Sequence, residues 1–373
     1  MRKNLKKYYK KVNKICFFLP SLKTGGAEKV FLNIANNISN EPKYKIFFIV
    51  GNSSRIYKNF LSKKIIFINL KNSRLRYTFF KLIKILKKEK FNVVFTTMPH
   101  TNVFLCIIKK LFRFNFKLIV RQSNVYKIPF ITLKSFIFLN LMKFTYKYAD
   151  YVVSNCKAVY SETSSLFKIK KNKNILIYNP TNFKFIKKSS KEKVDLKFFK
   201  TKEKKIISIG KLSKQKNFER LIEAANYLIN VLKKNYKILI IGEGENLNIL
   251  NKKIEEFKLK KNIKIIKFVK NPYKYIDKSD LVVQSSLWEG SSNILLEALS
   301  CNKRIVCFDI KGGTREILIN GKNGLIAKYD DYKDLAKKIL VSFDNKNNID
   351  KRNLSLFGVE NNIEKYKKLF NRN

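Results

Sequence analysis

The chain has 373 residues, enough for two ordinary domains that each bury a hydrophobic core. It carries 80 Lys and Arg against 27 Asp and Glu, a formal net charge of +53, and 45% of its residues are hydrophobic, which excludes an intrinsically disordered chain. The five scattered cysteines include no CxxC pair, and there is a single histidine, so we expect neither a zinc site nor a disulfide framework.

Targeting and membrane-spanning segments are not evident. A spanning helix needs about eighteen or more apolar residues in a row, and the nearest candidate, IPFITLKSFIFLNLM at 128–142, is interrupted by Lys134. The basic N-terminus precedes ICFFLP, which is too short for the apolar core of a signal peptide and has no cleavage site. We therefore expect the protein to stay on the cytoplasmic side.

The charge is unevenly distributed along the chain. Residues 1–180 hold 37 Lys and Arg but only five acids, whereas residues 181–373 hold 43 and 22. A bias in codon usage explains abundant lysine, but not scarce acids. A strongly cationic first half favours an anionic partner, either nucleic acid or a phospholipid surface, and composition alone does not decide between them.

In chain order, apolar runs rich in Val, Ile and Phe alternate with helical patterns. Because these runs are continuous, they predict strands that are buried on both faces, as in parallel sheets. The predicted strands of the first half are 15–19, 45–51, 65–70, 92–98, 117–123, 151–156 and 175–180. Those of the second half are 205–210, 237–244, 263–268, 281–286, 304–310 and 324–329. With the helical patterns between them, they form βαβ units.

A charged segment without a predicted strand, 181–204, separates the two sets and is interpreted as an interdomain linker. It divides the chain into an N-terminal domain, 1–180, and a C-terminal domain, 205–345. Each is predicted to be a doubly wound α/β domain, in which ligands bind beyond the carboxyl ends of the strands. Two such domains facing each other predict a ligand-binding cleft between them.

Two features of the first half follow predicted strands. SLKTGGAEKV places Gly25 and Gly26 before a helix start, where the backbone could approach a phosphate or a sugar closely. A simple turn explains this pair equally well. His100 follows the strand at 92–98. A lone histidine is more often structural than catalytic, although its position past a strand end favours a role in a site.

In the second half, KLSKQKNFERLIEA follows the strand at 205–210 and places Lys211 and Lys216 beside a helix start. Cations at a helix N-terminus suit a diphosphate, because both supply positive charge and N–H donors. A solvated, lysine-rich loop is an equally good interpretation. GEGENL forms the next tight turn, in which Gly242 and Glu243 could meet a ligand, but it lacks the third glycine of GxGxxG.

LWEGSSNILLEALS, 287–300, contains Glu289 and Glu297 in an acid-poor chain. A serine before the helix can cap it, with Glu297 about two turns inside, so that both carboxylates line one side of a cleft. The N–H groups near residues 292–294 would then point at an anion. An amphipathic helix with a surface Glu297 and an incidental Glu289 is the simpler interpretation of the spacing.

Several other chemistries lack their motifs. The sequence contains no GxxxxGK[ST] loop, no GxSxG elbow and no DxD-like acidic pair after a strand of the first half. If a diphosphate binds, lysines and helix N-termini must supply the positive charge that a metal supplies elsewhere. We therefore expect no metal and no other cofactor.

Five segments together resemble the GT-B retaining glycosyltransferases of the large group 1 family, family 4. They occur in the order of that family over about residues 13–345: PSLKTGGAEKVFLNIA, SIGKLSKQKNFERLIEA, LIIGEGENL, SSLWEGSSNILLEAL and GTREILINGKNGLIA. The resemblance implies two Rossmann-like domains that face a central cleft. It also implies a C-terminal helical segment, 346–373, that packs back on the N-terminal domain.

The resemblance further implies metal-independent transfer of a hexose or N-acetylhexosamine from a nucleotide-sugar, most commonly a UDP-sugar, with its anomeric configuration retained. Lys216 would stabilise the leaving diphosphate, together with Lys211, which stands where many members carry Arg. Further residues would bind the donor. Glu297 would bind the ribose, Glu289 would bind the sugar hydroxyls, and the backbone of Ser292, Asn293 and Ile294 would contact the sugar and the phosphate. Gly25 and Gly26 would face the diphosphate, Gly242 and Glu243 would lie nearby, and His100 would lie near the sugar.

In this family the N-terminal half meets the acceptor, which is often lipid-linked. The basic, aromatic segments MRKNLKKYYKK, RLRYTFFKLIKILKKEK and FITLKSFIFLNLMKFTYKY then suit an anionic membrane surface. We therefore expect an enzyme on the inner face of the cytoplasmic membrane that extends a lipid-linked oligosaccharide or a polysaccharide, with no nucleic-acid partner. The alternatives are a basic nucleic-acid-binding protein, for which no RNA-binding motif is found, and an epimerase or phosphorylase on the same architecture.

Overall fold

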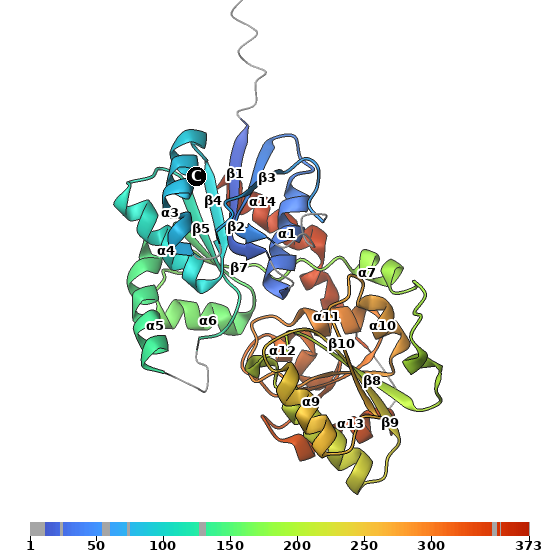
Figure 1. Ribbon diagram of the computed structural model, residues 1–373. Helices are drawn as coiled ribbons and strands as arrows, with labels where there is room; N and C mark the ends of the chain where they lie inside the picture. Colours follow the sequence, from blue (N-terminus) through green and yellow to red (C-terminus); the bar gives the residue numbers. More distant parts are fainter. Residues whose placement is uncertain are drawn as a thin grey trace, which may run out of the picture. The chain divides into compact units, whose positions relative to one another are not determined.

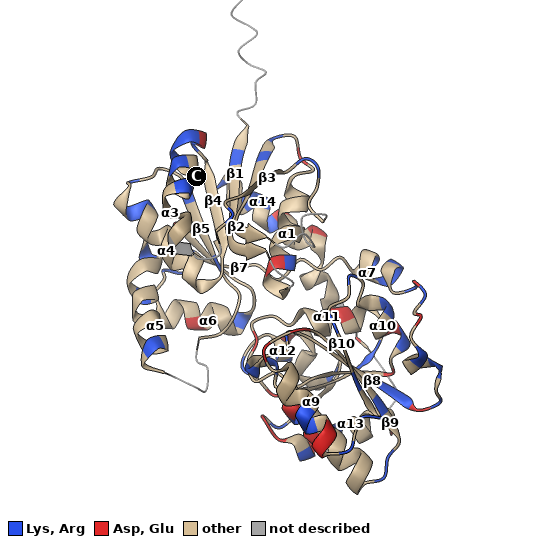
Figure 2. Cartoon of the chain, in the orientation of Figure 1, with Lys and Arg blue, Asp and Glu red and all other residues tan. Residues whose placement is uncertain are grey.

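The computed structural model describes residues 12–22, 25–53, 60–72, 75–126, 132–344, 349–350 and 352–372 (Figure 1). The basic segment MRKNLKKYYKK lies outside the described residues. The chain divides into two compact units, one of residues 1–180 with 360–373 and the other of residues 181–359. Figure 2 shows that Lys and Arg far outnumber acidic residues on the elements of the first unit.

The first unit is built on a seven-stranded parallel sheet of order β3-β2-β1-β4-β5-β6-β7. Its strands are β1 (Asn13–Leu22), β2 (Tyr44–Ser53), β3 (Ile66–Asn69), β4 (Val93–Thr97), β5 (Lys117–Gln122), β6 (Tyr151–Ser154) and β7 (Asn174–Leu176). The helices between them include α1 (Gly26–Ile38), α3 (Leu75–Glu89), α4 (Pro99–Leu111), α5 (Leu133–Thr145), η2 (Tyr146–Tyr148) and α6 (Lys157–Leu166).

The second unit is built on a six-stranded parallel sheet of order β10-β9-β8-β11-β12-β13. Its strands are β8 (Lys204–Ile209), β9 (Tyr236–Ile241), β10 (Ile263–Ile266), β11 (Leu281–Gln284), β12 (Arg304–Phe308) and β13 (Leu325–Ala327). Its helices include α7 (Phe183–Ser189), η3 (Lys197–Lys200), η4 (Lys214–Lys216), α8 (Phe218–Asn226), η5 (Tyr227–Val231), α9 (Leu247–Glu256), α10 (Tyr273–Lys278), α11 (Asn293–Ser300), α12 (Thr314–Ile317), η6 (Ile319–Gly321), α13 (Tyr332–Asp344) and η7 (Arg352–Phe357).

Both sheets are wound in the same way, outward from a central strand to one edge and then from the centre to the other edge. This is the doubly wound order, and the predicted fold class of two parallel α/β sheets is confirmed. All thirteen predicted strands are present, because their apolar runs are long enough to fill both faces of a sheet. The aromatic rings of Phe17, Phe31 and Phe95, for example, are fully buried in the first unit.

Residues 181–204, which the sequence assigned to a linker, belong to the second unit. The side-chain amide of Asn271 donates to the carbonyl of Ser189 at 2.8 Å, and the Ser300 hydroxyl donates to the carbonyl of Phe183 at 3.2 Å, so α7 is bound to its own unit. Ile186 of α7 is buried. Because the segment is rich in lysine, its sequence shows no clear apolar pattern for α7.

The last helix, α14 (Val359–Asn371), begins in the second unit and continues in the first. At its start, the amide of Val359 donates to the carbonyl of Thr181 at 3.0 Å. Near its end, the ring of Phe370 lies 6.1 Å from that of Phe17 and 5.6 Å from that of Phe95, centre to centre. Residues 360–373 therefore complete the aromatic core of the first unit.

Candidate active site

Seven of the twelve predicted site residues lie on two loops of the second unit or in helix α11, which follows one of these loops. One loop follows β8 and includes Lys216, and the other follows β11 and includes Glu289. Because β8 and β11 are hydrogen-bonded neighbours in a parallel sheet, both loops leave the same edge of the sheet, at the carboxyl ends of its strands. This is the edge at which doubly wound sheets bind their ligands.

Lys216 and Glu289 form an ion pair at this edge, in which Nζ of Lys216 donates to Oε1 of Glu289. The lysine side chain is 24% exposed and the glutamate side chain 10% exposed, so the pair is mostly shielded from water. The hydroxyl of Ser286 donates to the same Oε1 at 2.8 Å. Within the described part of the chain, no residue donates a hydrogen bond to Oε2.

Main-chain bonds hold the two loops together around this pair. The amide of Leu287 donates to the carbonyl of Gln215 at 2.8 Å, and the side chain of Gln215 donates to the carbonyl of Trp288 at 2.8 Å. The hydroxyl of Ser285 donates to the carbonyl of Lys216 at 3.0 Å. The backbone on both sides of the ion pair is therefore fixed before any ligand binds.

The lysine loop is also anchored where it enters α8. Asn217 adopts a left-handed conformation, with φ of 50°, and its side-chain amide donates to Oδ1 of Asp330 at 2.9 Å. Burial acts to raise the pKa of Asp330, but hydrogen bonds from Arg220 and Asn217 outweigh it, so the pKa lies below its ordinary value. The ionised carboxylate thus remains an acceptor for Asn217.

A third loop, after β12, supports Glu289 from its backbone side. The amide of Gly313 donates to the carbonyl of Gly290 at 2.6 Å. Gly312 has a φ of 145°, and a Cβ atom there would lie only 2.2 Å from the carbonyl oxygen of Glu289. Gly312 and Gly313 were not among the predicted site residues. A glycine pair after a strand end was the available signal for this support.

Helix α11 begins between the ion pair and Glu297. Its N-cap residue, Ser292, is 3% exposed and uses its hydroxyl to bind Oε1 of Gln284 at 2.7 Å rather than a helix amide. Asn293 and Ile294 form the first turn, whose N–H groups can bind an anion. Glu297 lies about one turn inside the helix, not two as expected, and is 8% exposed.

Lys211 and the turn after β9 lie at the same edge of the sheet, because β9 is hydrogen-bonded to β8 in parallel. Lys211 pairs with Glu245 at 2.9 Å, and both side chains are well exposed. A backbone hydrogen bond and, after it, the hydrogen bond from Lys211 lower the pKa of Glu245. A Cβ atom at Gly242 would lie 1.9 Å from the carbonyl of Gly210, so glycine allows this turn to pack against the lysine loop. The carbonyl of Glu243 accepts from the amide of Leu212 at 2.9 Å, which leaves its exposed side chain for other contacts.

The remaining predicted residues belong to the first unit. Gly25 is the N-cap of α1 and Gly26 its first residue. The carboxylate of Glu28 lies against Gly25, so the chain itself supplies an anion beside this helix start. His100 is exposed in the first turn of α4, and its ring lies 4.4 Å from that of Phe138 in α5.

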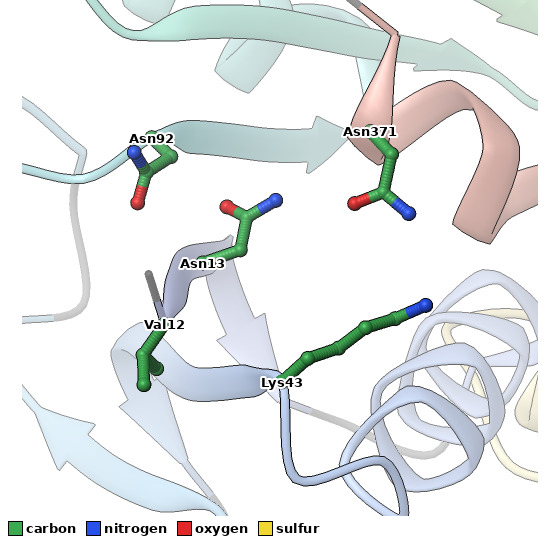
Figure 3. Close-up of a pocket in the computed structure, with 5 residues that line it drawn as sticks. All are labelled: Val12, Asn13, Lys43, Asn92 and Asn371. Carbon is green, nitrogen blue, oxygen red and sulfur yellow. The ribbon is translucent and has the colours of Figure 1, made fainter. Parts of the chain in front are cut away.

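One cavity of about 220 Å³ in the first unit lies away from the strand ends that bind ligands in such folds (Figure 3). Asn13, Lys43, Asn92 and Asn371 surround it, and the first three stand at or just before the start of a strand. The cavity therefore lies at the amino ends of the strands, and we assign it no role in donor binding.

Metal ions and reactive thiols are two other kinds of catalytic group. No cluster of three or more His, Cys, Asp and Glu side chains suited to a metal ion occurs among the residues that the structure describes. All five cysteines are buried free thiols, and burial raises the pKa of Cys106 and of Cys301 to about 12. These two thiols are therefore protonated at neutral pH and are poor nucleophiles.

Comparisons with known proteins agree with this fold. The family profile of the group 1 glycosyl transferases matches residues 189–354, and that of Glycosyltransferase Family 4 matches residues 24–185. An uncharacterized glycosyltransferase of Methanocaldococcus jannaschii is 30% identical over 318 residues, which cover 81% of this chain and 78% of that protein.

A second relative has a defined activity. The N-acetylgalactosamine-N,N'-diacetylbacillosaminyl-diphospho-undecaprenol 4-alpha-N-acetylgalactosaminyltransferase of Campylobacter jejuni is 28% identical over 330 residues, covering 86% of this chain and 87% of that enzyme. Among solved structures, Anabaena HepE in complex with UDP and glucose superposes with a TM-score of 0.78 at 16% identity, covering 97% of this chain and 100% of HepE. Together with the matching fold, the two adjoining profiles establish that the chain belongs to the group 1, family 4 glycosyltransferases of GT-B fold.

Proposed function

We propose that this glycosyltransferase moves a hexose or N-acetylhexosamine from a UDP-sugar to a lipid-linked glycan, with retention of the anomeric configuration. The observation that carries the proposal is the Lys216–Glu289 pair beside the N-terminus of α11, at the carboxyl ends of β8 and β11. This edge combines a cation, helix N–H groups and two shielded carboxylates, the groups that a diphosphate and a sugar require.

The mechanism that we propose depends on stabilising the leaving group. As the bond from the anomeric carbon to the phosphate oxygen breaks, negative charge develops on the diphosphate and positive charge on the sugar ring. Lys216 and the α11 N-terminus would stabilise the first, because fixed charges act strongly in a site shielded from water. The acceptor hydroxyl attacks from the same face and passes its proton to the departing phosphate.

The two carboxylates bind rather than react in this proposal. Glu297 would accept hydrogen bonds from the ribose hydroxyls, and Glu289 would accept them from the hydroxyls of the transferred sugar. Lys211 adds charge at the outer side of the diphosphate. No enzyme nucleophile and no metal ion take part, which differs from retaining glycosidases, where one carboxylate attacks the sugar.

The choice of donor and acceptor is supported by the relatives. The Campylobacter enzyme named above acts on an undecaprenol-linked diphosphate saccharide, and Anabaena HepE was crystallised with UDP and glucose. A second Campylobacter relative, 27% identical over 337 residues, also acts on a saccharide bound to undecaprenol through a diphosphate. We therefore propose a polyprenyl-diphosphate saccharide as the acceptor.

A lipid-linked acceptor requires contact with a membrane, and α5 is the surface that we propose for it. Five of its large apolar side chains are exposed: Leu133 by 77%, Phe136 by 53%, Ile137 by 60%, Leu141 by 40% and Phe144 by 60%. The helix contains no acidic residue, and the ammonium of Lys147 lies 4.3 Å from the centre of the Phe144 ring. Apolar groups flanked by lysine suit an anionic membrane surface.

The described helices include none with both the length and the apolar character to cross a bilayer. We propose attachment through this surface, on the inner face of the cytoplasmic membrane. Among the described residues, α5 has buried side chains only at Met142 and Thr145, which leaves most of its length for such contact.

The test of the proposed function is a transfer reaction with an undecaprenyl-diphosphate saccharide in detergent and a panel of UDP-sugars. Proton NMR of the product should show one new sugar with the α configuration of its donor. An inverted product would contradict the mechanism. A free epimerised UDP-sugar, formed without an acceptor, would instead indicate an epimerase on the same fold.

A further inference from the structure

Ser286 is the second residue after β11, and its side chain has no role in the mechanism described above. The residue is 1% exposed, and its hydroxyl donates to Oε1 of Glu289 at 2.8 Å. The ammonium of Lys216 donates to this same oxygen. One carboxylate oxygen therefore has two protein donors, while Oε2 receives none from the described residues.

Binding of the nucleotide-sugar affects these two hydrogen-bond donors differently. Lys216 is a flexible cation, and the negative diphosphate competes with Glu289 for it. A carboxylate that loses its cation at a shielded position is poorly solvated and turns toward another donor. The Ser286 hydroxyl has no charge for the phosphate to attract, so its bond to Glu289 persists.

The backbone on either side of Ser286 is fixed by other bonds. The preceding residue, Ser285, binds the carbonyl of Lys216, and the following residue, Leu287, binds the carbonyl of Gln215. Replacing the Ser286 side chain by alanine would remove one hydroxyl and leave these bonds in place. The site therefore allows a clean substitution.

We infer that Ser286 is a positioning residue, which holds Oε1 of Glu289 and keeps Oε2 directed at the hydroxyls of the donor sugar while Lys216 moves to the leaving diphosphate. This inference rests on the proposed donor site. It assigns to Ser286 a share in sugar recognition and in transfer, but none in the binding of the nucleotide.

The experiment compares UDP with intact UDP-sugars. Wild type and the variants Ser286→Ala and Ser286→Thr are titrated by calorimetry with UDP and with UDP-glucose, UDP-galactose and their N-acetyl forms, and donor turnover is measured with the sugar that wild type prefers. The matched control is Ser342→Ala in α13, which also removes one buried hydroxyl. The hydroxyl of Ser342 donates to the carbonyl of Ile339 at 2.7 Å.

In Ser286→Ala we expect unchanged affinity for UDP, within about twofold, and a loss of about ten- to a hundredfold in turnover, the size of one hydrogen bond to a charged group. The ratio of the affinity for the UDP-sugar to the affinity for UDP falls together with turnover. Ser286→Thr keeps the hydroxyl and restores much of the turnover and of the extra affinity for the UDP-sugar. Ser342→Ala changes neither turnover nor that affinity. Melting temperatures of all variants show whether the fold is intact.

Three results would overturn the inference. Turnover and sugar affinity of Ser286→Ala could equal those of wild type, the affinities for UDP and UDP-sugar could fall together, or threonine could fail to rescue a folded protein. If alanine prevents folding, Ser286→Cys keeps the volume with a weak donor and carries the same comparison. If wild type itself binds no UDP-sugar, the proposed function fails, and this is seen without any Ser286 variant.

Discussion

Lys216 and Glu289 affect the stability of the second unit as well as its chemistry. Each neutralises the other at a position where water is largely excluded. Removing one partner leaves a shielded charge without its counter-ion, which costs more than the pair contributes, whereas removing both charges is far less costly. Stability and activity can therefore be separated by substitution at this pair.

Lys216→Met and Glu289→Gln should each lower the free energy of unfolding by about 1 to 3 kcal/mol. The double variant should recover most of this loss, because no unpaired charge remains. Its transfer rate should stay about a hundred- to a thousandfold below wild type, since nothing then stabilises the leaving diphosphate. Urea unfolding and donor turnover measure the two effects, and a double variant that regains activity would contradict the role of Lys216.

Glu297→Ala should weaken UDP binding by about ten- to a hundredfold, because a shielded carboxylate that accepts from two ribose hydroxyls is lost. Thermal shift with UDP measures this. Glu255→Ala is the control, since Glu255 is a glutamate of the same unit whose side chain is 67% exposed and is paired with Lys260. An unchanged shift in Glu297→Ala would remove this residue from the site.

Single residues at this site were only partly predictable from the sequence. Lys216 and Glu289 were identified because each follows a strand end, and their chemistry suits a diphosphate and a sugar. Their contact was not predictable, since it joins loops that are 73 residues apart in the chain. The roles of Ser286 and Gly312 depend on the same tertiary contact, and neither residue has a distinctive side chain.

Among the loops and helices, the turn after β12 carries a sharp test of how Glu289 is held. Gly312→Ala should cost several kcal/mol and reduce transfer strongly, because a Cβ atom would collide with the carbonyl of Glu289. Gly321→Ala is the matched control. Gly321 also has a positive φ, of 102°, but a Cβ atom there would have no neighbour within 4 Å.

Gly321→Ala should cost only the backbone strain, about 1 to 2 kcal/mol, and leave the transfer rate nearly unchanged. Thermal unfolding and donor turnover of the two variants are compared side by side. Equal effects of both substitutions on turnover would mean that contact between the β12 loop and Glu289 is unimportant for the site.

Helix α5 carries the test of membrane attachment. Replacing Phe136, Ile137 and Phe144 by Ser should reduce binding to anionic vesicles by at least about tenfold. Burial of each apolar side chain in the lipid contributes roughly 1 kcal/mol or more to the free energy of binding. The control replaces Val231 and Ile249 by Ser, which are exposed by 58% and 51% in the second unit. Co-sedimentation at low salt measures both, and equal binding of wild type and the α5 variant would exclude this surface.

Secondary structure was more predictable than the site. Long runs of Val, Ile and Phe specified all thirteen strands, because strands buried on both faces need no alternation. Helix α7 was missed because four of its seven residues are Lys or Ser, and its burial depends on partners such as Asn271, far along the chain. Local composition does not contain that information.

For the whole molecule, the net charge of +53 raises the question of its partner. A lipid surface and a nucleic acid both attract such a chain, and both interactions weaken with salt. The α5 surface separates them, because exposed Phe and Ile insert into lipid but contribute little to binding a phosphate backbone. The family assignment adds that the second unit belongs to a sugar-transferring enzyme.

The central claim is that the second unit binds a nucleotide-sugar through Lys216 and the start of α11 without a metal ion. Calorimetric titration of the full chain with UDP-, GDP- and ADP-sugars, in the presence of EDTA, tests it most directly. We predict one UDP-sugar site per chain that EDTA does not affect and that Lys216→Met weakens at least about tenfold. Absence of binding to all of these sugars, or binding that EDTA abolishes, would contradict the account.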